Sequence, residues 1–191
     1  MNHFIRRIAP AHSLALLPLV LALAACGGGG DSASTPTPPP VAAALKMTGT
    51  AAVGAPMANA AIQVACSAGN ATTTADANGV YTITITDGAL PCVITATSSD
   101  GQTELHSVAA GTGQADTTAN VTPLSELLVA QLSGGDPKSF VASFTSSTTI
   151  APADVSAAQT ALLQTLTAAG VDTAAVGNIV SGAITAGSGT G

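Results

Sequence analysis

Residues Leu45–Ser98 read LKMTGTAAVGAPMANAAIQVACSAGNATTTADANGVYTITITDGALPCVITATS, and this stretch decides the fold. Its clearest unit is VYTITIT, Val80–Thr86, where every second residue is apolar and the threonines stand between them. A period of two predicts a strand with one buried face. The residues expected to face the core are Tyr81, Ile83 and Ile85. The preceding DANG, Asp76–Gly79, is typical of a tight turn, because Asp and Asn bond nearby backbone and glycine accepts a positive φ.

The same alternation recurs on either side of this strand, separated by short turns rich in glycine, asparagine and aspartate. The predicted strands cover about 45–52, 60–66, 71–75, 80–86, 92–98 and 103–108, with a further short one near 116–121. Short strands at such regular spacing favour an antiparallel sandwich of two sheets over βαβ units. We therefore predict a mainly β protein whose sandwich spans residues 44–121.

Residues 122–191 carry a helical period instead. Thr122 and Pro123 are typical of an N-cap and a first helical position, and Gly134 is a stop signal. Further helices are expected after the Asp136 cap, over Ala151–Ala169 and, more weakly because of Gly177 and Gly182, over Asp172–Ile184. Two interpretations stay open for this region: a cap on the sandwich, or an amphipathic surface that binds a partner. The glycine-rich end also leaves open the interpretation that this sequence is a piece of a longer protein.

The N-terminal segment is the most specific signal in the chain. Arg6 and Arg7 precede the apolar run Leu14–Leu23, which is too short to span a bilayer stably. The run ends in LAAC, with Cys26 followed by four glycines. This arrangement resembles the lipobox of bacterial lipoproteins, which implies cleavage after residue 25 and lipidation of Cys26. The alternative is a plain secretory peptide with an incidental cysteine.

The residues that follow the leader predict a tether and an acidic, membrane-anchored protein. Residues 26–43 are rich in Gly, Ser and Pro and are expected to hold the folded part away from the membrane. Without the two leader arginines, two lysines stand against ten acidic residues, which gives a net charge of −8. Because so few basic residues are present to neutralise phosphates, nucleic-acid binding is not expected. The resemblance to lipoproteins, with Gly27 rather than Asp after the cysteine, implies the outer membrane of a Gram-negative bacterium.

Several motifs of the β region resemble the carboxypeptidase regulatory-like domain, a transthyretin-like (prealbumin-type) sandwich. They are GTA at 49–51, GAPMANA at 54–60, IQV at 62–64 and TADANGVY at 74–81. The resemblance covers about residues 45–110 and implies a non-catalytic accessory or adhesive module. In addition, NVTPLSELLVAQLSGGDP at 120–137 resembles a segment of exported Gram-negative lipoproteins, to which no activity is attached.

Cys66 and Cys92 fall on the predicted apolar faces of their strands. Because the exported compartment is oxidising, we favour a disulfide between them over two buried thiols. On the chain-entropy account, such a bond would stabilise the fold by about 3–4 kcal/mol. A metal site at these cysteines is the third and least favoured interpretation, because no second Cys or His pair accompanies them in the sequence.

The residues that could carry catalysis are few after the leader. His106 lies close to Glu104 and directly precedes Ser107. Adjacent residues of a strand face opposite ways, so Ser107 cannot join His106 in a catalytic triad. We therefore interpret His106 as a solvated strand residue. A convergent polar pocket around His106 and Glu104 would instead indicate an enzyme. No cofactor and no metal are expected.

These observations lead to one hypothesis and one alternative. The hypothesis is a lipid-anchored protein of the cell envelope that acts as a non-catalytic structural or interaction module, with a protein or other envelope partner. The alternative is a lipoprotein that binds carbohydrate or peptide through the sandwich loops, although aromatic residues for stacking on a sugar are scarce, at 2% of the chain.

Overall fold

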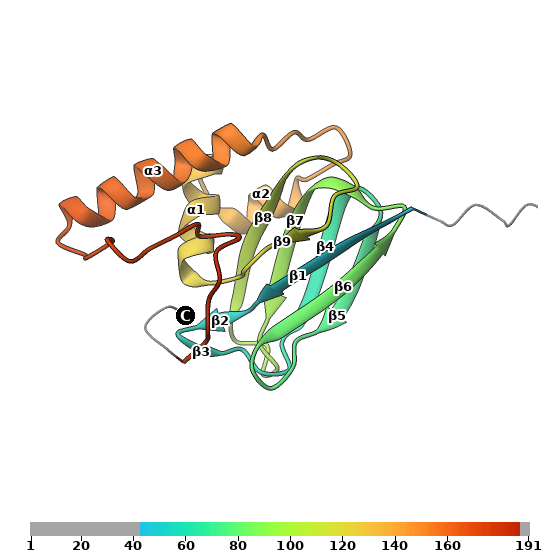
Figure 1. The fold of residues 1–191 in the computed structure, drawn as a ribbon, viewed down its shortest axis with the longest axis horizontal. Coiled ribbons are helices and arrows are strands. Elements are labelled where there is room, and N and C mark those ends of the chain that lie inside the picture. The colour runs from blue at the N-terminus through green and yellow to red at the C-terminus, as the bar shows by residue number, and fades with distance from the viewer. Residues whose placement is uncertain (1–42, 188–191) are drawn as a thin grey trace, which may run out of the picture. The chain divides into compact units, whose positions relative to one another are not determined.

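The computed structural model describes residues 43–187, which form a β-sandwich followed by a helical part (Figure 1). By its contacts the chain divides into residues 1–39 and 40–191, and every described residue belongs to the second unit. One sheet has the order β6-β1-β9 and the other the order β5-β4-β7-β8. The strands are β1 (Ala44–Thr50), β4 (Ala61–Ala68), β5 (Asn70–Thr74), β6 (Val80–Thr86), β7 (Ala89–Thr97), β8 (Glu104–Gly113) and β9 (Thr117–Thr118), and β2 (Ala52–Val53) pairs with β3 (Ala55–Pro56) in a small hairpin.

The first core lies between the two sheets. Along β6 buried and exposed residues alternate strictly, as the sequence predicts, and Tyr81, Ile83 and Ile85 point inward. The opposite sheet contributes every second residue of β4 and β7. These residues are Ile62, Val64, Cys66, Cys92, Ile94 and Ala96. The predicted sandwich and the predicted inward faces are confirmed.

Gly49 is required where β1 passes Tyr81. The Tyr81 hydroxyl donates to the carbonyl of Ala119, and a Cβ built on Gly49 would lie 2.0 Å from that carbonyl oxygen and 2.7 Å from the hydroxyl. No side chain fits there. Burial raises the pKa of Tyr81, so its hydroxyl stays a donor. This contact ties the segment that leads into the helical part to the middle of the sandwich.

Three helices follow, and their ends match the capping signals. They are α1 (Pro123–Ser133), α2 (Pro137–Ala142) and α3 (Pro152–Ala168). Thr122 caps α1 and accepts from the N–H of Ser125 at 3.2 Å, and Gly134 closes it in the left-handed region at φ 66°. Asp136 caps α2 in the same way, through Ser139 N–H at 2.8 Å.

A second core lies on the opposite face of β7 and β8, which the three helices cover (Figure 1). Val93 and Val108 point away from the sandwich interior and pack with Leu128, Val129 and residues of α3. The sheet that contains β7 is therefore buried on both faces at this position. The described residues, 43–187, are thus one unit with three layers: sheet, sheet and helices.

The prediction of a fourth helix over Asp172–Ile184 is wrong. These residues form turns, although Ile179 and Val180 are buried. Two residues from elsewhere hold this backbone. The Gln159 side chain donates to the Gly177 carbonyl and accepts the Ile179 N–H, while Asn120 donates to the Val180 carbonyl through its backbone N–H and to the Gly182 carbonyl through its side-chain amide. Gly177 and Gly182 disfavour a helix, and these bonds satisfy the backbone groups that a helix would otherwise pair.

Candidate functional site

Of the predicted site residues, Cys66 and Cys92 are joined, and Cys26 lies outside the described residues. Cys66 and Cys92 stand opposite each other in the β4–β7 register, with a Cα–Cα distance of 3.9 Å and an S–S bond of 1.99 Å. Both side chains point into the core between the sheets. The predicted disulfide is therefore present. It links the two central strands of the larger sheet, and its place in the core indicates a structural role.

The prediction that His106 is a solvated strand residue is wrong. Its side chain is 3% exposed and lies between β8 and the helices. Nδ1 is 3.0 Å from Oε2 of Glu126 on α1, and Nε2 is 3.6 Å from Oε1 of Glu104. Glu104 also pairs with Lys138 of α2 at 3.0 Å. The residues of this polar cluster are Glu104, His106, Glu126 and Lys138.

The cluster also closes the outer edge of β8. Glu126 accepts the backbone N–H of His106, and Ser125 Oγ donates to the His106 carbonyl at 2.8 Å. Two adjacent residues of α1 thus satisfy the two backbone groups that the next strand of a sheet would pair. This arrangement attaches α1 to β8.

Asp136 lies at the margin of the cluster. Hydrogen bonds from the side chain and the backbone of Ser139 hold the pKa of Asp136 below its usual range, and the neighbouring His106 and Lys138 act in the same direction. The aspartate is fully exposed at the start of α2. Its charge therefore stabilises the α2 cap next to the polar cluster.

The geometry of the cluster fits attachment better than catalysis. Ser107 points into the sandwich core, away from His106, and its hydroxyl is buried with no hydrogen-bond partner. The hydroxyl of Ser125 is already engaged with backbone carbonyls. Within residues 43–187, no group of three or more His, Cys, Asp and Glu side chains is placed to hold a metal ion. We interpret the cluster as the polar part of the sheet–helix interface.

An attachment role predicts unequal costs for the two glutamates of the cluster. Glu126→Ala should lower the free energy of unfolding by about 2 kcal/mol, because it leaves the buried N–H and imidazole of His106 without their acceptor. Glu104→Ala, which removes a solvent-exposed ion pair with Lys138, should cost about 0.5 kcal/mol. Urea unfolding of both variants measures the difference, and equal losses would contradict this role.

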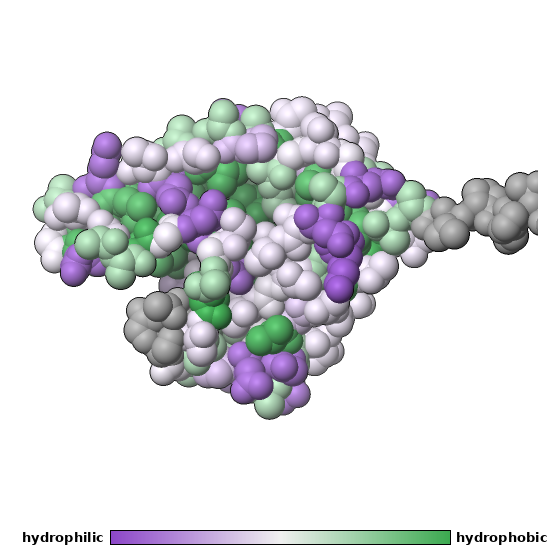
Figure 2. Space-filling view, viewed as in Figure 1, coloured by the Kyte–Doolittle hydropathy of each residue, from purple (hydrophilic) through white to green (hydrophobic). Residues whose placement is uncertain are grey.

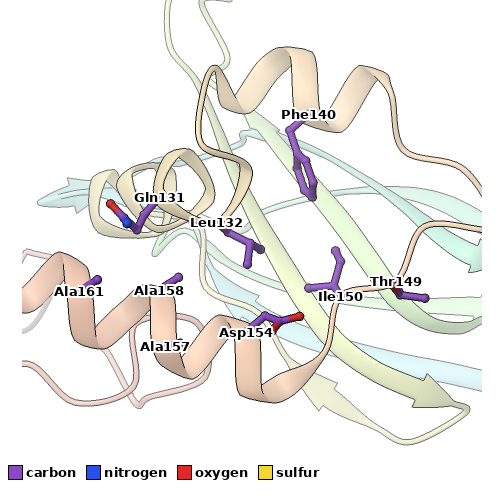
Figure 3. A pocket seen from close by; sticks show the side chains of 9 residues that line it. All are labelled: Gln131, Leu132, Phe140, Thr149, Ile150, Asp154, Ala157, Ala158 and Ala161. Atoms are coloured by element: carbon purple, nitrogen blue, oxygen red, sulfur yellow. The ribbon is translucent and has the colours of Figure 1, made fainter.

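One surface pocket lies among the helices. It has a volume of about 510 Å³, and Figure 3 shows Leu132, Phe140 and Ile150 pointing toward one another between the helices. Asp154 is the charged side chain of its lining. The pocket is wide open, and no reactive side chain points into it.

A second pocket, here called the distal pocket, also measures about 510 Å³. Three parts of the chain form it: the turn between β2 and β3, the start of α1, and residues 172–184. Its apolar lining residues are Val53, Leu124, Val176, Ile179 and Ile184. Asp172 is the one ionisable group among its described lining residues. The distal pocket is better enclosed than the pocket among the helices, and its walls are mainly aliphatic.

Sequence reasoning missed Glu126 and the distal pocket, because both depend on contacts between distant segments. A signal for the first was present: Val93 and Val108 are apolar residues on the strand faces expected to be polar. No comparable signal marks the pocket. No helix among the described residues has the length and apolarity needed to cross a membrane. Comparison with family models, curated proteins and solved structures found no match.

Proposed function

We propose that the protein is a lipid-anchored component of the bacterial cell envelope that acts by binding a partner and not by catalysis. The observation that carries this proposal is the N-terminal sequence, in which an apolar segment after two arginines ends at LAAC and Cys26. The resemblance to the carboxypeptidase regulatory-like domain points in the same direction, since that resemblance implies an accessory or adhesive module. Outer-membrane delivery in a Gram-negative host is part of the proposal.

The disulfide supports export independently of the leader. Disulfides persist in oxidising compartments and are rare in the cytosol. The Cys66–Cys92 bond lies in the sandwich core, where it crosslinks the two central strands of a sheet. A structural bond of this kind fits a protein that folds after translocation.

The surface chemistry favours a protein or peptide partner over a carbohydrate. Tyr81 is buried, and Phe140 and Phe144 are packed against the second core. Among the described residues, no aromatic ring therefore forms the flat exposed platform on which a sugar stacks. The apolar pockets would serve aliphatic side chains better.

Cys26→Ala tests the anchor directly. The wild-type chain should be recovered in the membrane fraction and should incorporate labelled palmitate, whereas the variant should lose the label and move to the soluble fraction, because a thioether-linked lipid is its only proposed attachment. Ser32→Ala, in the same tether, is the control and should behave as wild type. An unchanged distribution of the variant between fractions would refute the anchoring.

A further inference from the structure

The described residues contain four exposed large hydrophobic side chains; one of them lines the distal pocket, and two others lie close in sequence to lining residues. Val53 is 48% exposed and lines it. Leu127, 45% exposed, lies one helical turn beyond Leu124 of the lining, and Val171, 49% exposed, precedes Asp172. A concave pocket with apolar walls, one of them an exposed valine, is a candidate binding site.

One wall of the pocket comes from the β2–β3 hairpin that follows β1. β1 begins at Ala44, where the chain arrives from its N-terminal part, and leads at its other end to the β2–β3 hairpin (Figure 1). Seven residues of strand span roughly 20 Å at about 3.3 Å per residue. The hairpin wall of the pocket therefore lies at the opposite end of β1 from Ala44.

The charge around the pocket selects the chemistry of its ligand. Among the described lining residues Asp172 is the one ionisable group, and its Oδ1 accepts the N–H of Ala174 at 2.9 Å. None of the described residues that line the pocket is a cation, and the chain after the leader carries a net charge of −8. Anionic ligands, such as phosphates and acidic lipid headgroups, are disfavoured there. The aliphatic walls favour a large apolar group, and the carboxylate favours a cation next to it.

We propose that the distal pocket binds a segment of an exported partner protein in which large apolar side chains lie next to a lysine or arginine. This inference rests on the proposed function and adds the site and the chemistry of the partner. In Figure 2, hydrophobic residues gather between α3 and the C-terminal segment, whose residues 172–184 form one wall of the pocket; α3 itself contributes none of the lining. The apolar side chains of the ligand fill the pocket, and its cation pairs with Asp172.

The test uses the full chain in phosphatidylcholine nanodiscs and three fluorescent heptapeptides, read by fluorescence anisotropy. Their central residues are Leu-Phe-Lys, Leu-Phe-Glu or Ala-Ala-Lys. The first should bind most tightly. Asp172→Asn, which keeps an acceptor for Ala174, should weaken its binding about two- to fivefold and abolish its advantage over the Glu peptide. Val53→Ser should weaken binding about tenfold.

Val80→Ser and Asp87→Asn are the matched controls, since neither residue lines the pocket. Val80 is as exposed as Val53, at 46%, and both controls should bind the Lys peptide as wild type does. Equal binding of the Lys and Glu peptides, equal loss in Val80→Ser and Val53→Ser, or no binding of any peptide would overturn the inference. Membrane fractionation of Cys26→Ala decides the anchoring separately, so failure of the pocket and failure of the anchor are distinguishable.

Discussion

Leu128→Ala is expected to lower the free energy of unfolding by about 3 kcal/mol, the usual cost of emptying a well-packed leucine site. Leu128 is fully buried on α1 and packs with Val93 and Val108 on the outer face of the larger sheet. Because protein interiors are close-packed, the neighbouring side chains of the second core can move only partly into the space. Part of the void would therefore persist.

Leu127→Ala provides a matched control on the same helix. Leu127 is the preceding residue and has the same side chain, but it is 45% exposed, so its truncation should change stability by no more than about 0.5 kcal/mol. Urea unfolding followed by circular dichroism and by near-ultraviolet absorption of Tyr81 measures both variants. If the helices and the sandwich form one cooperative unit, the two signals should change together in Leu128→Ala.

Either of two results would contradict this account of the second core. One is a similar loss in Leu127→Ala and Leu128→Ala, which would mean that α1 does not bury the face described. The other is an early loss of helical signal while the Tyr81 signal persists, which would mean that the helices are a separately folding attachment. The shared contacts of Val93 and Val108 with the helices argue for cooperative unfolding.

The first core could be predicted from sequence because its signals are local. The alternation along Val80–Thr86 and the turn chemistry of Asp76–Gly79 specify which side chains face inward without knowledge of any other strand. In the turn, Asp76 accepts the N–H groups of Asn78 and Val80 at 2.8 and 2.9 Å, as its residue type predicts. The helix caps Thr122 and Asp136 are local signals of the same kind.

The second core could not be predicted in the same way, because strand periodicity says nothing about a third layer. His106 is predicted to face solvent if the face of β8 that it shares with Val108 is assumed to be exposed. The partner that buries it, Glu126, lies 20 residues later on a helix. Similarly, the distal pocket exists only where residues 172–184 return to the β2–β3 turn. The prediction for His106 was wrong and the distal pocket was not predicted, because both features are made by packing between distant segments.

Loss of the Cys66–Cys92 bond is expected to cost about 3.5 kcal/mol. The cysteines are 26 residues apart, and on the chain-entropy account a loop of that length restricts the unfolded chain by about this amount. The double variant Cys66→Ala/Cys92→Ala is the appropriate one, since a single substitution leaves a free thiol. For a domain of this size the melting temperature should fall by about 7–14 °C. Thermal unfolding of the two proteins measures the difference.

The number of free thiols in the chain tests both the proposed export and the proposed lipid anchor. The chain has three cysteines, two of which are joined in the sandwich core. If the protein is exported and lipidated, maleimide should label no thiol in the denatured, unreduced chain, because the third, Cys26, carries the lipid. One labelled thiol would mean that export occurs without lipidation of Cys26. Labelling of Cys66 or Cys92 in protein isolated from the cell envelope would contradict the disulfide, and with it the independent support for an exported protein.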